Sequence, residues 1–228
     1  MIKKALYAVR VVSQRGVRFL FHYFFESYLF DLKHGTKTSS RVTKDEQNIC
    51  STKSEQENGL LYVASFTSVT RDTVSLAKTI LGNERFGRSQ FVDLGCGKGK
   101  ALLVHALYFG KVHNEPGVGI EYDADLAITA RDNVKKCGIQ EDRVKVVTDS
   151  AVNLKQHVSS KELVVYLYNS FQGETLKNVL TVLSTVPHIL IYVDPAERVV
   201  LPEYGYTVHY EQIGKYHADT WLVASANL

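Results

Sequence analysis

The chain has 228 residues, of which 45% are hydrophobic and 22% are charged, as is ordinary for a globular protein with a buried core. Its three cysteines (Cys50, Cys96 and Cys137) are odd in number and form no C-x-x-C pair, which argues against a disulfide framework or a zinc site and favours a reducing cytoplasm. No apolar run approaches the roughly 18 residues that span a bilayer, and we expect no signal peptide.

Charge is distributed unevenly along the chain. Residues 1–44 contain nine Lys/Arg and two acids, a net of +7, whereas the remainder contains 18 basic and 22 acidic residues. This asymmetry predicts an acidic partner for the N-terminal part, which can be anionic lipid, nucleic acid or an acidic protein.

Residues 1–30 have the periodicity of a helix. Apolar residues recur at three- and four-residue spacing from Val17 to Leu29, while Arg18, His22 and Glu26 mark the other face. The helix packs on the main domain, lies on a membrane surface or serves as a mitochondrial targeting peptide, and the pattern leaves these alternatives open. Residues 36–58 are almost without apolar side chains and predict a loop or lid. We therefore divide the chain into an extension, 1–58, and a domain, 59–228.

Residues 59–228 predict an α/β fold. A helical pattern from Gly59 ends near Gly82-Asn83, and from residue 90 short apolar runs alternate with helical stretches. This order predicts a Rossmann-like, doubly wound, parallel sheet with helices on both faces. The last two runs, "YTVHYEQIG" and "DTWLVASAN", alternate in polarity and are joined around Gly214, which predicts an antiparallel hairpin at the sheet edge. With this hairpin the predicted sheet has seven strands.

The stretch "FVDLGCGKGK" (91–100) predicts a ligand loop, because three alternate glycines follow an apolar run. A phosphate-binding P-loop requires G-x-x-x-x-G-K-[ST], but Lys100 is followed by Ala101. The dinucleotide fingerprint G-x-G-x-x-G also fits poorly, because Lys100 occupies the third glycine position.

The pattern D-x-G-x-G-x-G (Asp93, Gly95, Gly97, Gly99) resembles the first motif of class I S-adenosylmethionine (SAM)-dependent methyltransferases. A carboxylate at the strand end suits the ammonium and sulfonium of SAM. The glycines admit its methionyl part, with Cys96 and Lys98 contributing mainly backbone. The resemblance covers residues 90–226 and implies the seven-strand methyltransferase fold, with SAM as cofactor and S-adenosylhomocysteine as product.

Acids at the next two strand ends extend this resemblance. Glu121, followed by Tyr122, stands where the family binds the ribose hydroxyls; the alternative is a solvated acid. Asp149, followed by Ser150, stands where it binds adenine; the alternative is a helix N-cap. The implied cofactor-binding residues are Asp93, Gly95, Cys96, Gly97, Glu121, Tyr122, Asp149, Ser150 and Asn169.

Candidate catalytic residues are Asn169, Phe171 and Tyr62. "NSF" (169–171) resembles the N-P-P-F motif of methyltransferases acting on nitrogen, although it is shorter and lacks proline; a helix N-cap at Asn169 and a core position for Phe171 are the alternatives. "LLYVASFTSVTRDTV", which contains Tyr62, resembles the entry segment of seven-strand lysine methyltransferases. "FDLKHGTKTSS" (30–40) looks like the preamble of uncharacterised bacterial methyltransferases.

These residues predict a SAM-dependent methyltransferase that acts on nitrogen, with a protein lysine or a small amine as methyl acceptor. The competing hypotheses are a non-catalytic SAM-binding domain docked through its basic N-terminus and a nicotinamide oxidoreductase. Nucleic acid is disfavoured as a substrate because no recognition motif is present and the core is slightly acidic. The histidines show no metal-ligand spacing, so we expect no metal, and His105 lies on an apolar helix face that predicts a core position.

Overall fold

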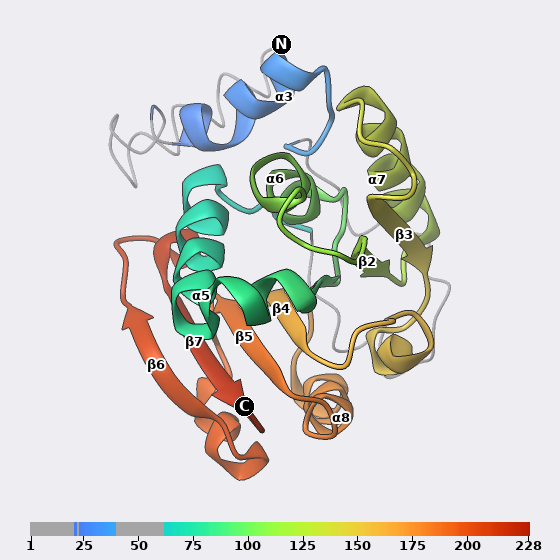
Figure 1. The fold of residues 1–228 in the computed structure, drawn as a ribbon. Coiled ribbons are helices and arrows are strands. Elements are labelled where there is room, and N and C mark those ends of the chain that lie inside the picture. The colour runs from blue at the N-terminus through green and yellow to red at the C-terminus, as the bar shows by residue number, and fades with distance from the viewer. Residues whose placement is uncertain (1–20, 22, 40–61) are drawn as a thin grey trace.

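A computed structural model describes residues 21, 23–39 and 62–228 of the chain. They contain one seven-stranded sheet with the order β3-β2-β1-β4-β5-β7-β6 (Figure 1). The first five strands are parallel, whereas β7 is antiparallel to both β5 and β6. The strands are β1 (Gln90–Leu94), β2 (Gly117–Glu121), β3 (Val144–Thr148), β4 (Leu163–Tyr168), β5 (His188–Val193), β6 (Thr207–Gln212) and β7 (Trp221–Ala226). The predicted fold, including the C-terminal hairpin, is confirmed.

Helices cover both faces of this sheet. On one face α5 packs against α6, which contacts α7, and on the other face α8 packs against η3 (Figure 1). Each face has its own hydrophobic cluster, in which side chains alternate along the buried strands. The helices are α5 (Thr67–Arg88), α6 (Lys100–Phe109), α7 (Ala124–Lys136), η3 (Ala151–Gln156), α8 (Gly173–Leu183), η4 (Arg198–Tyr204) and η5 (His217–Asp219).

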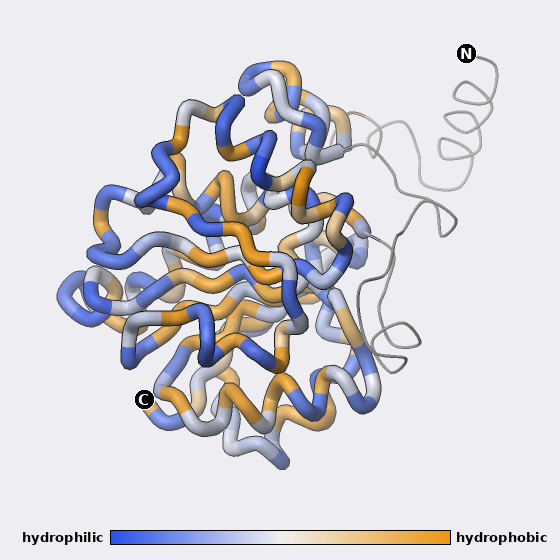
Figure 2. The backbone as a smooth tube through the Cα atoms, turned by 90° about the vertical axis from the view of Figure 1, so that its right-hand side faces the viewer, coloured by the Kyte–Doolittle hydropathy of each residue, from blue (hydrophilic) through white to orange (hydrophobic). Residues whose placement is uncertain are grey.

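Burial is deepest in the centre of the sheet. Every residue of β1, β2 and β5 is buried, and hydrophobic segments are concentrated in the middle of the molecule (Figure 2). The two edge strands are more solvated, since β3 is only partly buried and β6 is exposed along its whole length. A strand buried on both faces needs continuous apolar sequence, which is why the central strands could be predicted from the sequence.

The first helix of the domain differs from its prediction at both ends. It begins at Thr67, because Phe66 is extended (φ −72°, ψ 138°), and residues 62–66 are not helical. At its other end the chain adopts φ 74° and ψ 162° at Gly82 and then continues as helix to Arg88. Glycine tolerates this conformation, so Gly82 marks a break between two helical segments rather than the end of the helix.

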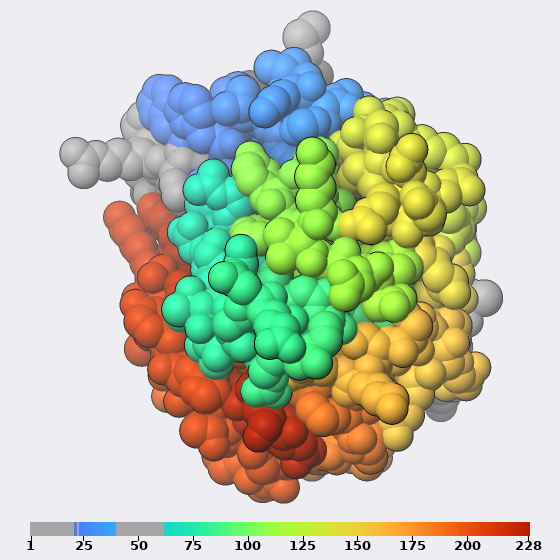
Figure 3. Space-filling view, in the orientation of Figure 1, coloured from blue at the N-terminus to red at the C-terminus, as the bar shows by residue number. Residues whose placement is uncertain are grey.

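Residues 23–39, which we call the N-terminal strap, lie across α5, α6 and α7 (Figure 3). They form η1 (Phe24–Tyr28) and α3 (Leu29–His34), so the helix predicted to end at residue 30 reaches His34. The carboxylate of Asp31 then organises the turn that follows. It accepts hydrogen bonds from Thr36 Oγ1 (2.6 Å), Thr38 Oγ1 (2.7 Å) and the backbone N–H of Ser39 (2.7 Å). Residues 1–20 and most of the predicted 36–58 loop fall outside the described residues.

Candidate functional site

The glycine loop after β1 turns tightly against the end of β2. The backbone N–H groups of Gly95 and Cys96 both donate to the carbonyl of Ile120, at 2.8 and 3.1 Å. Gly95 and Gly97 have φ values of 69° and 53°, a region that residues with a Cβ rarely adopt.

Close neighbours also require these two glycines. A Cβ on Gly95 would lie 2.4 Å from Cβ of Ser170, and one on Gly97 would lie 2.1 Å from the ring of Tyr62. The sequence-predicted loop is therefore flanked by two of the predicted acceptor-side segments, 169–171 and the segment containing Tyr62.

Glu121 joins the end of β2 to the glycine loop. Its Oε2 accepts a 2.6 Å hydrogen bond from the N–H of Gly97, and its Oε1 accepts a 3.0 Å bond from the N–H of Asp123. The side chain is buried, so the alternative of a solvated acid is wrong. The backbone N–H of Tyr122 also hydrogen-bonds this carboxylate, which leaves acceptor capacity for about one hydrogen bond from a ligand.

Asp93 is turned toward the start of α6. Its Oδ2 accepts from the N–H of Leu102 at 3.2 Å, in the first turn of a helix whose N-cap residue, Gly99, has no side chain. Asp93 thus satisfies a helix-terminal N–H group that would otherwise lack a partner. This contact gives it a structural role beside its predicted ligand role.

Burial disfavours the ionised forms of Glu121 and Asp93. It raises the pKa of Glu121 to about 7, although the N–H groups of Asp123 and Gly97 act in the opposite direction. Burial likewise raises the pKa of Asp93 to about 7; the N–H of Leu102 lowers it, and the charge of Glu121 raises it further. Two carboxyl groups with raised pKa values at one sheet edge are typical of a functional site.

A small, mainly apolar hollow opens next to this loop. Its lining residues are Gly95, Ile120, Tyr122, Asp149, Ala151, Phe171 and Thr175. Four of them were predicted from the sequence as cofactor or catalytic residues (Gly95, Tyr122, Asp149 and Phe171). Phe171 is also a core residue, 4% exposed, as its core interpretation predicted, and its catalytic role stays a prediction.

Asp149 faces the hollow while it organises the short helix η3. Its Oδ1 accepts from the N–H of Ser150 (2.7 Å) and from Asn153 Nδ2 (2.8 Å), and its Oδ2 pairs with His157 Nε2 (2.6 Å). The N-cap itself is Ser150, whose hydroxyl accepts from the N–H of Val152 at 3.4 Å. The N-cap interpretation therefore applies to Ser150, and Asp149 remains at the rim of the hollow.

Thr175 is a candidate that the sequence analysis missed. It lies in the first turn of α8, is 5% exposed, and its Oγ1 has no hydrogen-bond partner among the described residues. A buried hydroxyl without a partner is costly and can be satisfied by a ligand. No sequence pattern marks this residue, because a single Thr in a helical stretch is ordinary.

Asn169 occupies the end of β4 but is not a helix N-cap. The N-cap of α8 is Gln172, and Asn169 instead has a φ of 36° and donates from Nδ2 to Asp194 Oδ2 at 3.0 Å. Its neighbour Ser170 donates to the carbonyl of Leu94 at 3.1 Å, which holds this segment against the glycine loop.

Of the aromatic residues near the strand ends, Tyr166 belongs to the core. It is buried, and its hydroxyl lies 3.2 Å from Thr70 Oγ1 of α5. The predicted core position of His105 is confirmed, because its ring is 1% exposed and stacks on Phe91 at 3.9 Å.

The N-terminal strap reaches the same loop. Tyr62 donates its hydroxyl hydrogen bond to the carbonyl of Thr38 at 2.8 Å. Asn133 of α7 accepts from the N–H of Lys37 (2.9 Å) and donates to the carbonyl of Lys98 in the glycine loop (3.0 Å). These contacts join the strap to the glycine loop through Tyr62 and Asn133.

Lys100 fixes the strap to the start of α6. Its Nζ lies 3.7 Å from the centroid of the Phe30 ring and 3.4 Å from the carbonyl of Glu26. Burial lowers the pKa of Lys100 to about 7, while the charges of Asp31 and Glu26 oppose that shift. Lys100, which follows the third glycine, thus packs against the strap. In a P-loop the corresponding lysine would contact a phosphate.

Comparison with solved structures assigns the fold to a class. The chain superposes on the ribosomal protein L11 methylase from Lactobacillus delbrueckii subsp. bulgaricus with a TM-score of 0.51, at 12% identity over 83% of this chain and 90% of that one. A protein from Clostridium thermocellum described as an rRNA methylase gives 0.51 at 15% identity, over 73% and 97%. A point mutant of MtNAS in complex with S-adenosylmethionine gives 0.50 at 13% identity, over 70% of this chain and 62% of that one.

No family model matches the sequence, and no curated protein matches it. The structural neighbours nevertheless superpose on most of the chain. The fold is therefore that of the class I SAM-dependent methyltransferases, as the glycine motif indicated.

The raised pKa values of Glu121 and Asp93 predict a pH-dependent stability. A folded-state pKa of about 7 exceeds the unfolded value of an acid, so the folded protein holds more protons between about pH 4.5 and 7. The free energy of unfolding should fall by a few kcal/mol as the pH rises through this range. Urea unfolding at several pH values measures it.

The matched variants are Glu121→Gln and, as control, Glu203→Gln, which changes an exposed carboxylate of η4. Glu121→Gln should flatten the slope of stability against pH, and Glu203→Gln should leave it unchanged. Equal slopes in Glu121→Gln and the unmodified protein would contradict the assignment of this pH dependence to Glu121.

Proposed function

We propose that this protein binds SAM along the carboxyl edge of its sheet and transfers the methyl group to a nitrogen acceptor. The observation that carries the proposal is the pair of buried carboxylates, Asp93 and Glu121, of which Glu121 bonds the glycine loop and Asp93 bonds the helix that follows it. Burial penalises their charged forms, and a ligand that brings a cation and hydroxyl donors relieves this penalty. SAM brings an ammonium, a sulfonium and two ribose hydroxyls, whereas a pyrophosphate would be repelled.

The residues of the site fit the parts of SAM. Glu121 would accept a hydrogen bond from the ribose hydroxyls through its remaining acceptor capacity. Adenine would lie against the residues that line the hollow, with Asp149 accepting from its amine and the hydroxyl of Thr175 donating to a ring nitrogen. Tyr62, against Gly97, would border the methionyl part, whose ammonium the Asp93 carboxylate would attract.

SAM supplies a methyl carbon activated by its sulfonium. The task of the chain is to align the acceptor with that carbon and to exclude water, which can contribute roughly 7–11 kcal/mol. Phe171 and the apolar wall of the hollow support the exclusion of water, and Asn169 stands at the end of β4 where the acceptor would approach.

We infer that the acceptor is an amine, either a protein lysine or a small molecule. Asp194, which contacts Asn169, gives this part of the edge a carboxylate that attracts a cationic amine and repels a polyanion. Two structural neighbours are described as an rRNA methylase and a ribosomal protein L11 methylase, so RNA and protein both belong in a substrate screen.

Calorimetric titration with SAM, S-adenosylhomocysteine and NADH tests the cofactor. We expect the first two to bind and Glu121→Ala to weaken them roughly 10- to 100-fold, because hydrogen bonds to a charged group are lost. Glu203→Ala should bind as the unmodified protein does.

Binding of NADH alone would contradict the proposal and favour the alternative hypothesis of a nicotinamide oxidoreductase. Tight SAM binding without transfer of a labelled methyl group to protein, small amines or RNA would favour a non-catalytic SAM-binding domain.

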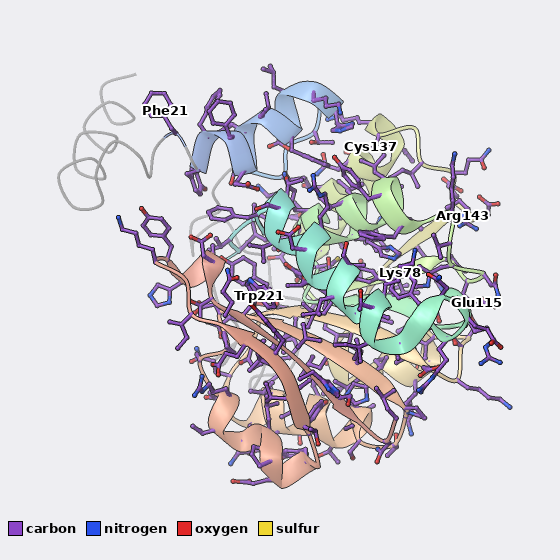
Figure 4. The ribbon with its side chains drawn as sticks, turned by 60° about the vertical axis from the view of Figure 1, so that its left-hand side comes forward. Phe21, Lys78, Glu115, Cys137, Arg143 and Trp221 are labelled. Atoms are coloured by element: carbon purple, nitrogen blue, oxygen red, sulfur yellow. The ribbon has the colours of Figure 1, made fainter. Side chains whose placement is uncertain are left out.

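We further propose that the protein acts in the cytoplasm and touches an anionic membrane surface through its N-terminal part. Large apolar residues form one exposed stripe that starts at Phe21 and continues along η1 and α3. Figure 4 shows Phe21 at the outer end of this segment, away from the sheet. The stripe consists of Phe21, Phe24, Phe25, Tyr28, Leu29 and Leu32, which are 41–77% exposed. With a net charge of +7 over residues 1–44, it combines the two features of an interfacial helix. No helix in the described part of the chain is both long and apolar enough to cross a membrane.

Vesicle co-sedimentation tests this contact. The protein should sediment with vesicles containing phosphatidylglycerol and much less with pure phosphatidylcholine, and Phe25→Ser with Leu32→Ser should abolish the difference. The control Val199→Ser removes an equally exposed apolar side chain from η4. Binding that the double variant leaves unchanged would contradict membrane contact through the stripe.

A further inference from the structure

A row of hydrogen-bonded side chains crosses the carboxyl ends of β4, β5 and the start of β7. Asn169 Nδ2 donates to Asp194 Oδ2 at 3.0 Å, and Asp194 Oδ1 pairs with His217 Nδ1 at 2.9 Å. The cofactor assignment uses Asn169 alone, so the Asp194–His217 pair has no role in it.

The backbone at both ends of the first bond is strained. Asn169 has a φ of 36° and Asp194 a φ of 49°, and they immediately follow the neighbouring parallel strands β4 and β5. Left-handed conformations at non-glycine residues cost free energy and cluster at functional sites. Here the strain places an amide and a carboxylate side by side at the edge that also carries the glycine loop.

His217 is held on one side and open on the other. Its side chain is 83% exposed, although Nδ1 is bound to a carboxylate. Because a carboxylate accepts, Nδ1 donates to Asp194, and in the neutral imidazole Nε2 is then the acceptor. A carboxylate that orients an imidazole in this tautomer is the arrangement of a general base.

The row is continuous with the cofactor edge. Ser170, next to Asn169, donates to the carbonyls of Leu94 (3.1 Å) and Gly95 (3.4 Å), so the glycine loop lies at one end of the row and His217 at the other. Trp221, which begins β7, pairs with Val193, and η5, which precedes it, contacts β5. An acceptor bound over Asn169 would lie between the glycine loop and the imidazole.

We propose that His217, oriented by Asp194, is the catalytic base that removes a proton from the attacking amine; this inference rests on the proposed methyltransferase function. The protonated amine has no lone pair, so one N–H bond must break, and its proton passes to Nε2 of His217. The freed nitrogen pair forms the N–C bond to the methyl carbon while the C–S bond breaks and leaves its electrons on sulfur. The imidazolium is stabilised by Asp194 and later loses its proton to solvent.

The charged groups around His217 favour a cationic acceptor. Asp194 faces it from the end of β5, and Asp219 lies on its own short helix. The Tyr168 hydroxyl of β4 is influenced by both Asp194 and Asp219 and stays protonated, because burial raises its pKa. Lys215, the nearest cation in sequence, lies with its Nζ 5.7 Å from the Tyr216 ring centroid. Two carboxylates on this side thus attract the ammonium that His217 would deprotonate.

The test uses the full chain with poly-L-lysine and spermidine as acceptor probes and labelled SAM. His217→Gln should lower kcat at least about 100-fold, leave the dissociation constant of SAM unchanged and regain activity with added imidazole. Asp194→Asn should also lower kcat, because it removes the carboxylate that orients His217. His209→Gln is the matched control, since His209 bonds Ser225 Oγ (2.6 Å), which lies opposite Ile189 at the start of β5.

A second readout does not depend on turnover. In NMR spectra recorded with S-adenosylhomocysteine, spermidine should shift the imidazole signals of His217 and leave those of His209 in place. Unchanged kcat and pH profile in His217→Gln would overturn the base assignment while the methyltransferase function stands. Transfer to neither amine from bound SAM would overturn the amine acceptor and the base together, and failure to bind SAM would overturn the proposed function itself.

Discussion

The 2.6 Å hydrogen bond from the N–H of Gly97 to Glu121 is the interaction on which the site depends. It fixes the glycine loop against the end of β2 and holds the carboxylate at the sheet edge. The loop can approach so closely only because Gly97 has a φ of 53° and leaves room for the ring of Tyr62. Tyr62 in turn donates a hydrogen bond to Thr38, so a chain of contacts links the sheet, the loop and the N-terminal strap.

The burial of the Glu121 carboxylate carries a free-energy cost that ligand binding can offset. Glu121 and Asp93 are buried together, and burial raises the pKa of each to about 7. A fold that keeps two such carboxylates at one edge gives up stability near neutral pH. This is the usual balance between stability and function at a binding site. It also explains why the cofactor we propose is a cation: its charge stabilises the ionised carboxylates, whereas a phosphate would add to the repulsion.

Sequence patterns were sufficient for the sheet and for the loop. Buried parallel strands require continuous apolar runs, and the alternate glycines of residues 95–99 mark a turn that other residues cannot make. What the sequence could not reveal depends on tertiary contacts. The break at Gly82 lies within a continuing helix, Asn169 bonds a residue 25 positions away, and the hydroxyl of Thr175 is important only because a hollow lies beside it. His217 could not be predicted either, since its partner Asp194 follows a different strand.

A crystal structure with bound S-adenosylhomocysteine would test the central claim most directly. The account predicts a ribose hydroxyl within hydrogen-bond distance of Glu121, adenine against the hollow beside Thr175 and Asp149, and the homocysteine part against Gly95 and Gly97. A ligand bound away from this edge, or bound there without a contact to Glu121, would contradict it.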